Sequence, residues 1–358
     1  MPGEILINGK FYSAQMTGVH RVAEELLRAL DDLASAGEIT LPHAAKIVLP
    51  ANAARIPRFQ NIETAPPGKL PWVWWEQVEL PWRARRDVLL NLCNLGPLAH
   101  RGGITMIHDA QIYITPESYS RAFVAWYRVA LPILGRRSRK ILTVSDYSRR
   151  MLVAHGVARS DRIVVIPNGV DHILRSTSDM NAFEKLGLAD KGYVLALAAT
   201  HAHKNIGLLF DAFRKMPDLK LVLIGAADKA AFAAKGHNAP DNVVFAGRVT
   251  DDEMRGLMER ALCFACPSLT EGFGLPPLEA MLIGCPAIAA PCGALPEVCG
   301  DAALYADAKD PTAWGAAINA LRADSNLRAE KAAAGITQAS RFTWRNSARL
   351  LADVLNQA

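Results

Sequence analysis

Residues 271–279 read Glu-Gly-Phe-Gly-Leu-Pro-Pro-Leu-Glu, a glycine-rich loop that runs into a helix start and carries a carboxylate at each end. The two prolines suit the first helical turn, where a missing N–H group costs nothing. The two glycines let the backbone approach a ligand closely, and the free N–H groups of a helix N-terminus attract anions. Glu271 and Glu279 are suited to accept hydrogen bonds from the hydroxyls of a sugar or a ribose. The stretch therefore predicts a pocket for a sugar joined to a diphosphate.

Around this stretch, short apolar runs rich in β-branched residues alternate with helical segments along the whole chain. Such alternation favours α/β domains with parallel sheets. We expect strands at residues 4–8, 46–49, 87–92, 104–107, 140–144, 162–166, 193–199, 219–224, 243–245, 262–265, 287–289 and 303–305. We expect helices at residues 18–36, 118–136, 146–155, 205–215, 251–259, 277–283, 311–322, 326–339 and 344–356. The turn residues Pro-Asn-Gly-Val-Asp at 167–171 interrupt the alternation, which predicts two doubly wound halves joined near residue 170.

The composition is that of a globular protein, because 51% of the 358 residues are hydrophobic, which excludes a disordered chain. The length favours two domains. No run reaches the ~18 apolar residues of a membrane span, and the start Met1-Pro2-Gly3-Glu4 lacks the pattern of a signal peptide. We therefore expect a cytoplasmic protein, either free or at the inner face of the cytoplasmic membrane, with no nucleic-acid partner.

The six cysteines include one Cys-x-x-Cys pair, Cys263 and Cys266. No second pair of cysteines or histidines completes a zinc site. The pair lies in Ala-Leu-Cys-Phe-Ala-Cys-Pro, a run that is typical of a buried strand, where free cysteines act as small apolar residues. The sequence also has no Asp-x-Asp motif, so we expect no bound metal.

The Glu-x7-Glu signature at residues 271–279 resembles that of the retaining GT-B glycosyltransferases, in particular their large family four. The resemblance implies an α/β protein of two Rossmann-like domains that face each other across a cleft. The acceptor-side domain would comprise residues 1–170 and the donor-binding domain residues 171–341. In this family the last helix, here within residues 342–358, crosses back to the first domain. Ligands in such open sheets bind outside the carboxyl ends of the strands, so we expect the site there.

The resemblance also assigns roles within the signature. Glu271 would accept hydrogen bonds from the donor-sugar hydroxyls, and Glu279 from the ribose hydroxyls. The backbone of the loop and of the first helical turn would meet the sugar and the diphosphate through Gly272, Phe273, Gly274 and Leu275. A Gly-x-x-Pro-Glu segment at residues 293–297 also matches the family, and we expect it to be structural.

A second donor-side segment precedes the signature. Lys204 lies in a His-Lys-Asn run that resembles the donor-phosphate segment of the family, and Thr200 can donate from the same loop. The alternative for Lys204 is a solvated lysine at a helix start. Many relatives carry an arginine earlier in this loop, and Arg248 is the candidate to replace it. Because the turn at residues 247–249 falls where relatives hold the nucleobase, Val249 is a candidate base contact.

Three segments of the first half resemble acceptor-side motifs. Gly18 follows Thr17, a potential helix cap, and would let a diphosphate approach the helix N-terminus. His108 precedes Asp109 at a strand end and resembles a family pair in which the histidine lies against the donor sugar. The plain alternative for His108 is a hydrogen-bonded histidine at a strand end. Ser145 resembles part of a Ser-x-x-Ser segment, but a helix cap is an equal explanation.

Four tryptophans and three arginines gather at residues 72–86: Trp72, Trp74, Trp75, Trp82, Arg83, Arg85 and Arg86. Aromatic residues beside cations suit a membrane interface or a surface on which sugars stack, and ordinary packing is the competing explanation. The basic helix expected within residues 120–140 has two explanations of its own: it rests on lipid headgroups, or it is a core helix with a solvated end. The net charge of +5 is uneven, because residues 1–170 hold 21 Lys and Arg against 14 Asp and Glu, a net of +7, and the remainder a net of −2. A basic first half fits an anionic membrane, an acidic acceptor or plain solvation.

These observations together predict a hexosyltransferase of bacterial polysaccharide biosynthesis, with lipopolysaccharide as one such product. The His-Lys-Asn and Thr-Gly-Val-His-Arg segments resemble mannosyltransferases, so GDP-mannose is the favoured donor, a UDP-hexose the second choice, and a glycan or lipid-linked oligosaccharide the acceptor. We expect His108, Lys204 and Glu271 to act in catalysis and the departing phosphate to take the acceptor proton. Alternatives are a GT-B nucleotide-sugar epimerase and a non-catalytic carbohydrate-binding relative. The missing Gly-x-Gly-x-x-Gly fingerprint disfavours a dehydrogenase.

Overall fold

The computed structural model describes residues 3–41 and 43–357, and the chain divides into two compact units. The first unit comprises the residues up to Pro116, Ser120–Gly169 and the segment from Thr343 onward. The second unit comprises Val170–Phe342 together with Glu117–Tyr119. Met1, Pro2, Pro42 and Ala358, which the expected domain ranges include, lie outside the described residues.

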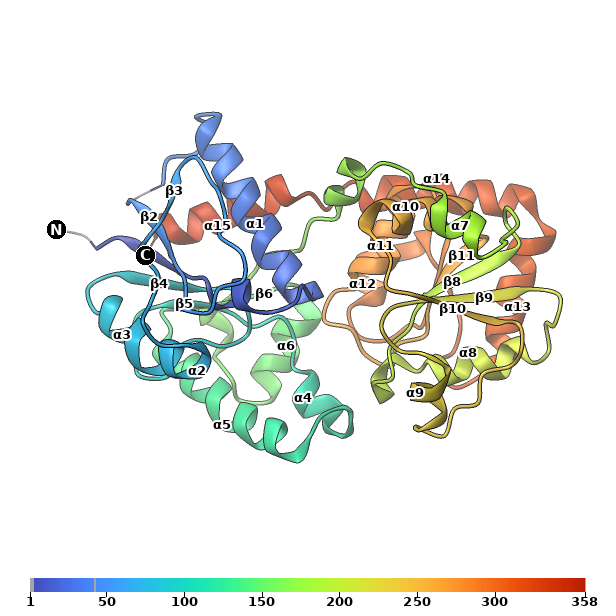
Figure 1. The fold of residues 1–358 in the computed structure, drawn as a ribbon, viewed down its shortest axis with the longest axis horizontal. Helices are drawn as coiled ribbons and strands as arrows, with labels where there is room; N and C mark the ends of the chain where they lie inside the picture. The colour runs from blue at the N-terminus through green and yellow to red at the C-terminus, as the bar shows by residue number, and fades with distance from the viewer. Residues whose placement is uncertain (1–2, 42, 358) are drawn as a thin grey trace. The chain divides into compact units, whose positions relative to one another are not determined.

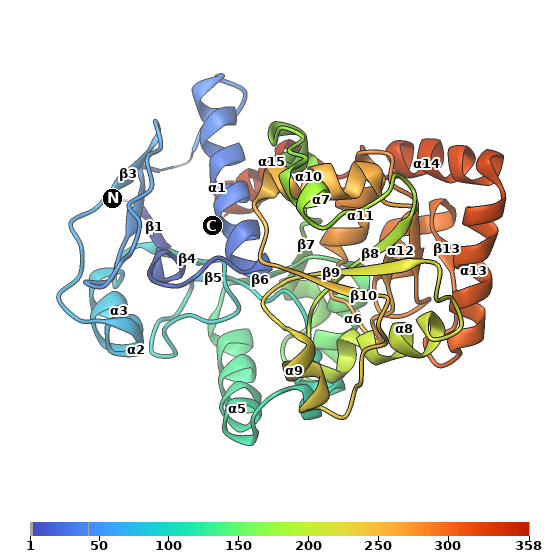
Figure 2. The ribbon, with the colours of Figure 1, turned by 45° about the vertical axis from the view of Figure 1, so that its right-hand side comes forward.

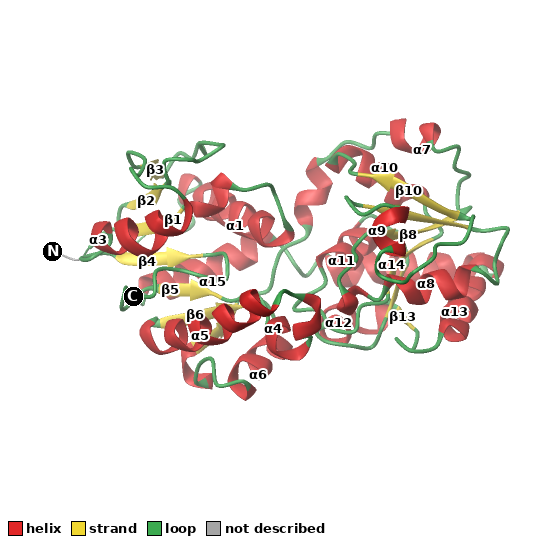
Figure 3. Cartoon of the chain, turned by 60° about the horizontal axis from the view of Figure 1, so that its bottom comes forward, coloured by secondary structure: helices red, strands yellow, loops and turns green. Residues whose placement is uncertain are grey.

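In the described part of the first unit, seven strands form a parallel sheet in the order β3-β2-β1-β4-β5-β6-β7 (Figure 3). Because β1 and β4 are neighbours in the middle of this order, the chain winds outward from them in both directions, as in a doubly wound sheet. The strands are β1 Ile5–Asn8, β2 Ala45–Val48, β3 Ile62–Thr64, β4 Val88–Asn91, β5 Ile104–Met106, β6 Lys140–Thr143 and β7 Ile163–Val165.

The helices of the first unit are α1 Gly18–Ser35, α2 Trp72–Trp74, α3 Leu80–Arg83, α4 Gln111–Ile114, α5 Arg121–Arg137, α6 Asp146–Ala154 and α15 Trp344–Asn356. A π-helical segment, Trp75–Glu79, joins α2 to α3. The last helix, α15, packs against α1 (Figure 1, Figure 2), and Arg345 and Arg349 form ion pairs with Glu38. The expected return of the C-terminal helix to the first domain is therefore confirmed.

The second unit repeats the plan with six strands within its described residues, in the order β10-β9-β8-β11-β12-β13. These strands are β8 Tyr193–Leu197, β9 Lys220–Ile224, β10 Val243–Gly247, β11 Cys263–Cys266, β12 Ala287–Ala289 and β13 Leu304–Tyr305. The helices are α7 Asn181–Lys185, α8 Ile206–Phe213, α9 Lys229–Ala233, α10 Asp251–Arg260, α11 Leu275–Leu282, α12 Leu295–Cys299, α13 Pro311–Ala323 and α14 Ser325–Ala339. Neighbouring strands β8 and β11 form the middle of this sheet.

The sequence pattern located the long elements and missed the short ones. All the expected strands and long helices are present, but the edge strand β3 and the short helices α2, α3, α4, α7, α9 and α12 were not predicted. Elements of three to five residues hold too few side chains to show a period. The expected helix start at residue 118 is wrong because the Ser120 side chain caps α5, which begins at Arg121. The start at residue 205 is also wrong because Asn205 is left-handed, with φ of 57°.

The cysteines are unpaired, and both members of the Cys-x-x-Cys pair lie buried in β11. Across residues 3–41 and 43–357, none of the helices combines the length and the hydropathy that a membrane span requires. Within the same residues, no three His, Cys, Asp or Glu side chains lie close enough together to hold a metal ion.

Candidate functional site

The centre of the second unit carries an ion pair between two residues that the sequence singled out. Lys204 follows β8 and Glu271 follows β11, the neighbouring strand. The Lys204 Nζ lies 2.8 Å from Glu271 Oε1. The Ser268 hydroxyl donates to the same oxygen at 2.6 Å. The pair therefore lies at the carboxyl ends of the two middle strands, where open α/β sheets bind ligands.

The Glu271 carboxylate is held in its ionised form. Its side chain is only 12% exposed, and burial by itself raises the pKa of a carboxyl group. The Lys204 ammonium and the hydrogen bonds from Lys204 and Ser268 outweigh this burial and hold the pKa of Glu271 below its ordinary value. The site thus presents a charged acceptor next to a cation at neutral pH.

The glycine-rich loop and α11 follow directly. Gly274 takes a left-handed conformation with φ of 105° directly before α11, and prolines lie in the first turn of the helix as expected. The Phe273 ring packs edge-to-face on Phe342 at 5.5 Å, so its side chain anchors the loop in the unit. Because the loop is fixed by this packing, its backbone N–H groups and the N-terminus of α11 have a defined position beside the pair.

Glu279 lies one turn into α11 and has a partner that sequence reasoning missed. The His172 Nε2 lies 3.0 Å from Glu279 Oε1, and the histidine side chain is buried. His172 comes from a short 3-10 helix, Asp171–Arg175, far from Glu279 in the sequence. The histidine orients the carboxylate predicted to meet a ribose.

Gly293 supports Glu271 from the other side. Its φ of 64° favours glycine, and a Cβ at this position would lie 2.7 Å from the Glu271 carbonyl oxygen. The N–H of Ala294 donates to the same carbonyl at 3.0 Å. Residues 293–297, for which we expected a structural role, therefore position the backbone of Glu271.

A buried histidine lies beside the pair and was not predicted as a site residue. His203 precedes Lys204, and its Nδ1 lies 2.9 Å from the hydroxyl of Ser118, which belongs to the same unit. Burial, reinforced by the Lys204 charge, lowers the pKa of His203 to about 4. The ring is therefore neutral at neutral pH, and Lys204 is the cation of this segment.

Three further donor-side candidates are less closely tied to the pair. Thr200 is half-buried in the loop that leads from β8 to Lys204. Arg248 and Val249 follow β10, which β9 separates from β8. The Arg248 side chain is exposed and Val249 is half-buried. The structure places the turn at residues 247–249 at the same sheet edge but does not pair Arg248 with Glu271 through any contact between described residues.

In the first unit, Gly18 begins α1, and the Thr17 side chain caps the helix by accepting from the His20 N–H at 3.5 Å. A Cβ on Gly18 would meet nothing within 4 Å, so packing inside this unit does not require glycine there. Ser145 caps α6 in the same way, at 3.0 Å from the Ser148 N–H. The cap is therefore a sufficient explanation for Ser145.

His108 follows β5 and is buried. Its Nε2 donates to the Leu92 carbonyl at 2.8 Å, and burial lowers the pKa of the ring to about 4. Because a neutral imidazole carries one N–H, the Nδ1 atom is then an acceptor. His108 is therefore a hydrogen-bonded histidine at a strand end, as the alternative explanation requires. Its contact with a donor sugar stays a prediction.

Two family models match the chain over most of its length. The model described as Glycosyltransferase Family 4 matches residues 16–173, and Glycosyl transferases group 1 matches residues 179–338. The chain is 33% identical to O-antigen chain mannosyltransferase B of Escherichia coli, with 70% of this chain and 69% of that protein covered. It is 28% identical to O-antigen chain mannosyltransferase RfbU of Salmonella typhimurium, with 62% of this chain and 61% of the relative covered.

Solved structures share the fold. Sucrose-phosphate synthase from Thermosynechococcus elongatus superposes with a TM-score of 0.75 at 18% identity, over 99% of this chain and 98% of that one. Anabaena HepE in complex with UDP and glucose gives 0.73 at 20% identity, over 99% and 100%. These likenesses confirm the GT-B architecture, and with the matches of sequence they show that the chain belongs to the glycosyl transferases group 1, in glycosyltransferase family 4.

Proposed function

We propose that this glycosyltransferase is a retaining, metal-independent mannosyltransferase that moves mannose from GDP-mannose to a glycan acceptor during synthesis of a bacterial surface polysaccharide. The names of the E. coli and Salmonella relatives, both O-antigen mannosyltransferases, support the sugar and the pathway class. The observation that carries the proposal is the Lys204–Glu271 pair beside the N-terminus of α11.

The pair supplies the two kinds of group that a nucleotide sugar needs. Lys204 and the N-terminus of α11 offer positive charge to the diphosphate. Among the described residues, the bonds to Glu271 from Ser268 and Lys204 end on Oε1. The second carboxylate oxygen, Oε2, is therefore the atom that accepts from the mannose hydroxyls, and Glu279, oriented by His172, accepts from the ribose.

The reaction breaks the bond between the anomeric carbon and the phosphate oxygen and forms one to the acceptor oxygen. Negative charge grows on the departing diphosphate, where Lys204 and the α11 N-terminus stabilise it. The acceptor hydroxyl attacks on the face that the phosphate leaves, and its proton passes to the departing phosphate oxygen, so the anomeric configuration is retained. Because lysine and helix supply the positive field, the scheme routes no step through a metal ion.

We also assign two further contacts to the donor. The His108 Nδ1 accepts a hydrogen bond from the donor sugar, and Val249, in the turn at residues 247–249, contacts the nucleobase. Gly18 leaves open space at the start of α1, which suits the approach of the same diphosphate. A UDP-hexose is the second choice of donor, because Val249, the residue assigned to the base, has no polar side chain that would select one base.

A peripheral membrane contact is part of the proposal. Trp82 is exposed, and the Arg85 guanidinium lies 4.9 Å from its ring. Arg83 and Arg86 line the same surface. An exposed indole with neighbouring cations suits the interface of an anionic bilayer. A lipid-linked acceptor would be presented at such a surface.

The test is a product assay with purified protein, GDP-mannose and a synthetic mannoside acceptor, read by mass spectrometry, with NMR of the new anomeric centre. We expect transfer with an α linkage, unaffected by EDTA and abolished in Glu271→Gln. Conversion of GDP-mannose without an acceptor would favour an epimerase. Inversion at the anomeric carbon, or loss of transfer with EDTA that added divalent metal restores, would contradict the mechanism.

A further inference from the structure

The first unit contains a pocket to which no ligand has been assigned so far. It has a volume of about 410 Å³ and is lined by Asn8, Lys10 and Glu76 on its polar side and by Phe11, Trp72 and Tyr127 on its aromatic side. Asn8 ends β1, and the pocket also touches the loop after β4. Since β1 and β4 are the middle strands, the pocket lies at the switch point where doubly wound sheets bind ligands.

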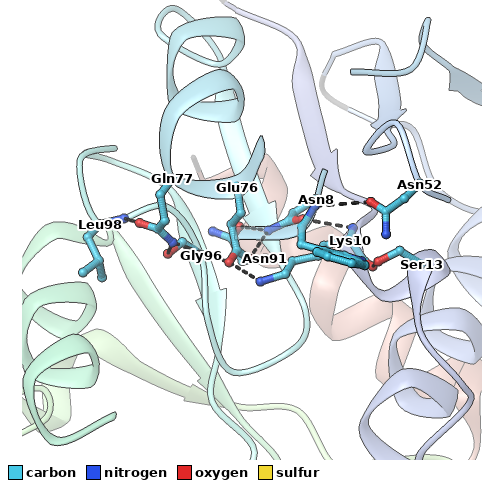
Figure 4. A network of polar contacts seen from close by, with 10 residues as sticks. Asn8, Lys10, Ser13, Asn52, Glu76, Gln77, Asn91, Gly96 and Leu98 are labelled. Atoms are coloured by element: carbon cyan, nitrogen blue, oxygen red, sulfur yellow. Dashed lines mark hydrogen bonds and ion pairs between the residues drawn. The ribbon is translucent and has the colours of Figure 1, made fainter. Parts of the chain in front are cut away.

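A buried carboxylate is among the groups that line this pocket. Glu76 is 3% exposed, and Figure 4 shows it among Asn8, Lys10 and Gln77. The Lys10 Nζ lies 2.5 Å from Glu76 Oε2, and the Asn8 Nδ2 donates to Oε1 at 3.2 Å. Asn8 is in turn fixed by its bond to Asn91, at 3.0 Å. The polar groups are therefore held in place before any ligand arrives.

The charges of this pocket cancel. Glu76 carries one negative charge, and the Lys10 ammonium beside it one positive charge. An ammonium has three N–H groups, so Lys10 can donate to a ligand as well as to Glu76. Paired charges with spare donors and acceptors suit a neutral ligand rich in hydroxyl groups, whereas a phosphate would meet the buried carboxylate with like charge.

Trp72, on the aromatic side, is exposed and held in an unusual backbone conformation. Trp72 is 62% exposed and has a φ of 45°, a region that bulky residues avoid. Its N–H donates to Asn52 Oδ1 at 3.2 Å, which holds this conformation. The following residues, Trp75–Glu79, form a π-helical turn that carries Glu76. Strained residues and π-helical turns gather at functional sites.

We propose that this pocket binds the terminal, uncharged sugar of the glycan acceptor. Lys10 donates to the sugar hydroxyls, the Glu76 carboxylate and the Asn8 Oδ1 accept from them, and the Trp72 ring packs on a face of the sugar. The inference rests on the proposed transferase function and narrows it, because the acceptor unit is a neutral saccharide rather than a phosphorylated alcohol or a lipid phosphate.

The test compares binding of two probes to the full-length protein by saturation-transfer NMR, with GDP present: an α-mannotriose and inositol 1-phosphate. We expect the wild type to show saturation transfer to the mannotriose, which reports binding. Trp72→Ala and Glu76→Gln should bind the mannotriose about tenfold more weakly, and Trp72→Phe should recover the binding. Trp74→Ala is the matched control, because Trp74 lies in the same helix, is 70% exposed and does not line the pocket.

The variants keep the result interpretable. Trp72 is exposed, so its replacement leaves the core intact even if Glu76→Gln unfolds the protein. Equal mannotriose binding in Trp72→Ala and Trp74→Ala, or tighter binding of inositol 1-phosphate than of mannotriose, would overturn the inference. Binding of GDP-mannose, measured in the same samples, separates the outcomes: if the donor binds and the mannotriose does not, only this inference fails, and if neither the donor nor GDP binds, the proposed function fails first.

Discussion

Replacing Lys204 by methionine removes the cation that faces Glu271 while keeping most of the side-chain volume. At 2.8 Å and an effective dielectric constant of about 20, the attraction between the two charges is about 6 kcal/mol. Desolvation of the buried carboxylate offsets more than half of it. The Lys204 side chain is 27% exposed, so solvent screening lowers the remainder further. We therefore expect Lys204→Met to lower the free energy of unfolding by about 2 kcal/mol, or about 6 °C in melting temperature.

The pH dependence of this loss identifies its cause. In the wild type the pKa of Glu271 is held below its ordinary value, so its contribution to stability is present above that ordinary pKa and is lost as the pH falls through the folded-state pKa. Without Lys204, burial dominates and the pKa rises, so the variant loses stability as the pH increases past the ordinary pKa. The difference between wild type and variant should therefore grow from acid to neutral pH.

The assay is thermal unfolding of four proteins between pH 4 and pH 8: wild type, Lys204→Met, Glu271→Gln and the double variant. We expect the double variant to be about 2 kcal/mol more stable than the sum of the single losses predicts, because neither charge is left alone. Additive losses, or a difference between wild type and Lys204→Met that does not change with pH, would refute the reasoning.

Three further predictions concern stability and the membrane. The pKa values of His108 and His203 are lowered to about 4. As the pH falls from 6.5 towards 4, each histidine should therefore lower the free energy of unfolding by up to about 3 kcal/mol, measured by urea unfolding. A free energy of unfolding that does not change over this range would contradict both pKa values. Gly293→Ala should destabilise the protein by about 2 kcal/mol, because the new methyl group meets backbone atoms at a residue with a positive φ. The control is Gly315→Ala, in open space within α13, which should be neutral or stabilise the protein by up to about 1 kcal/mol. Equal melting temperatures of the two variants would show that Gly293 is not constrained. Trp82→Ser should reduce sedimentation with vesicles containing phosphatidylglycerol and leave the weak response to neutral vesicles unchanged, and an unchanged response to anionic vesicles would remove this surface from the proposal.

The parts of the fold that the sequence revealed are those governed by local rules. Gly274 and the prolines that follow it predict a loop and a helix start, and α11 begins at Leu275, two residues before the expected start at residue 277. The run of small and apolar residues around Cys263 and Cys266 likewise predicted a buried strand, which is β11. In these cases the residues near one another in the sequence determine the structure, so no tertiary information was needed.

The partners of the site residues could not be predicted in this way. His172 meets Glu279 across 107 positions, and Lys10 meets Glu76 across 66, so only the folded chain brings each pair together. Ser268 lies three residues before Glu271, but nothing in its type distinguishes it from a loop serine. The positive φ of Trp72 conflicts with the preference of its side chain, so no propensity rule could have predicted it.

The central claim is that the second unit binds a nucleotide sugar through Lys204, Glu271 and the N-terminus of α11. Calorimetric titration of the wild type and Glu271→Gln with GDP-mannose, using GDP as the reference, tests it most directly. We predict that the wild type binds both ligands, and that the variant binds GDP as before but GDP-mannose at least about tenfold more weakly, because only the sugar contact is lost. Equal affinity of both proteins for GDP-mannose, or no binding of any nucleotide by the wild type, would contradict the account.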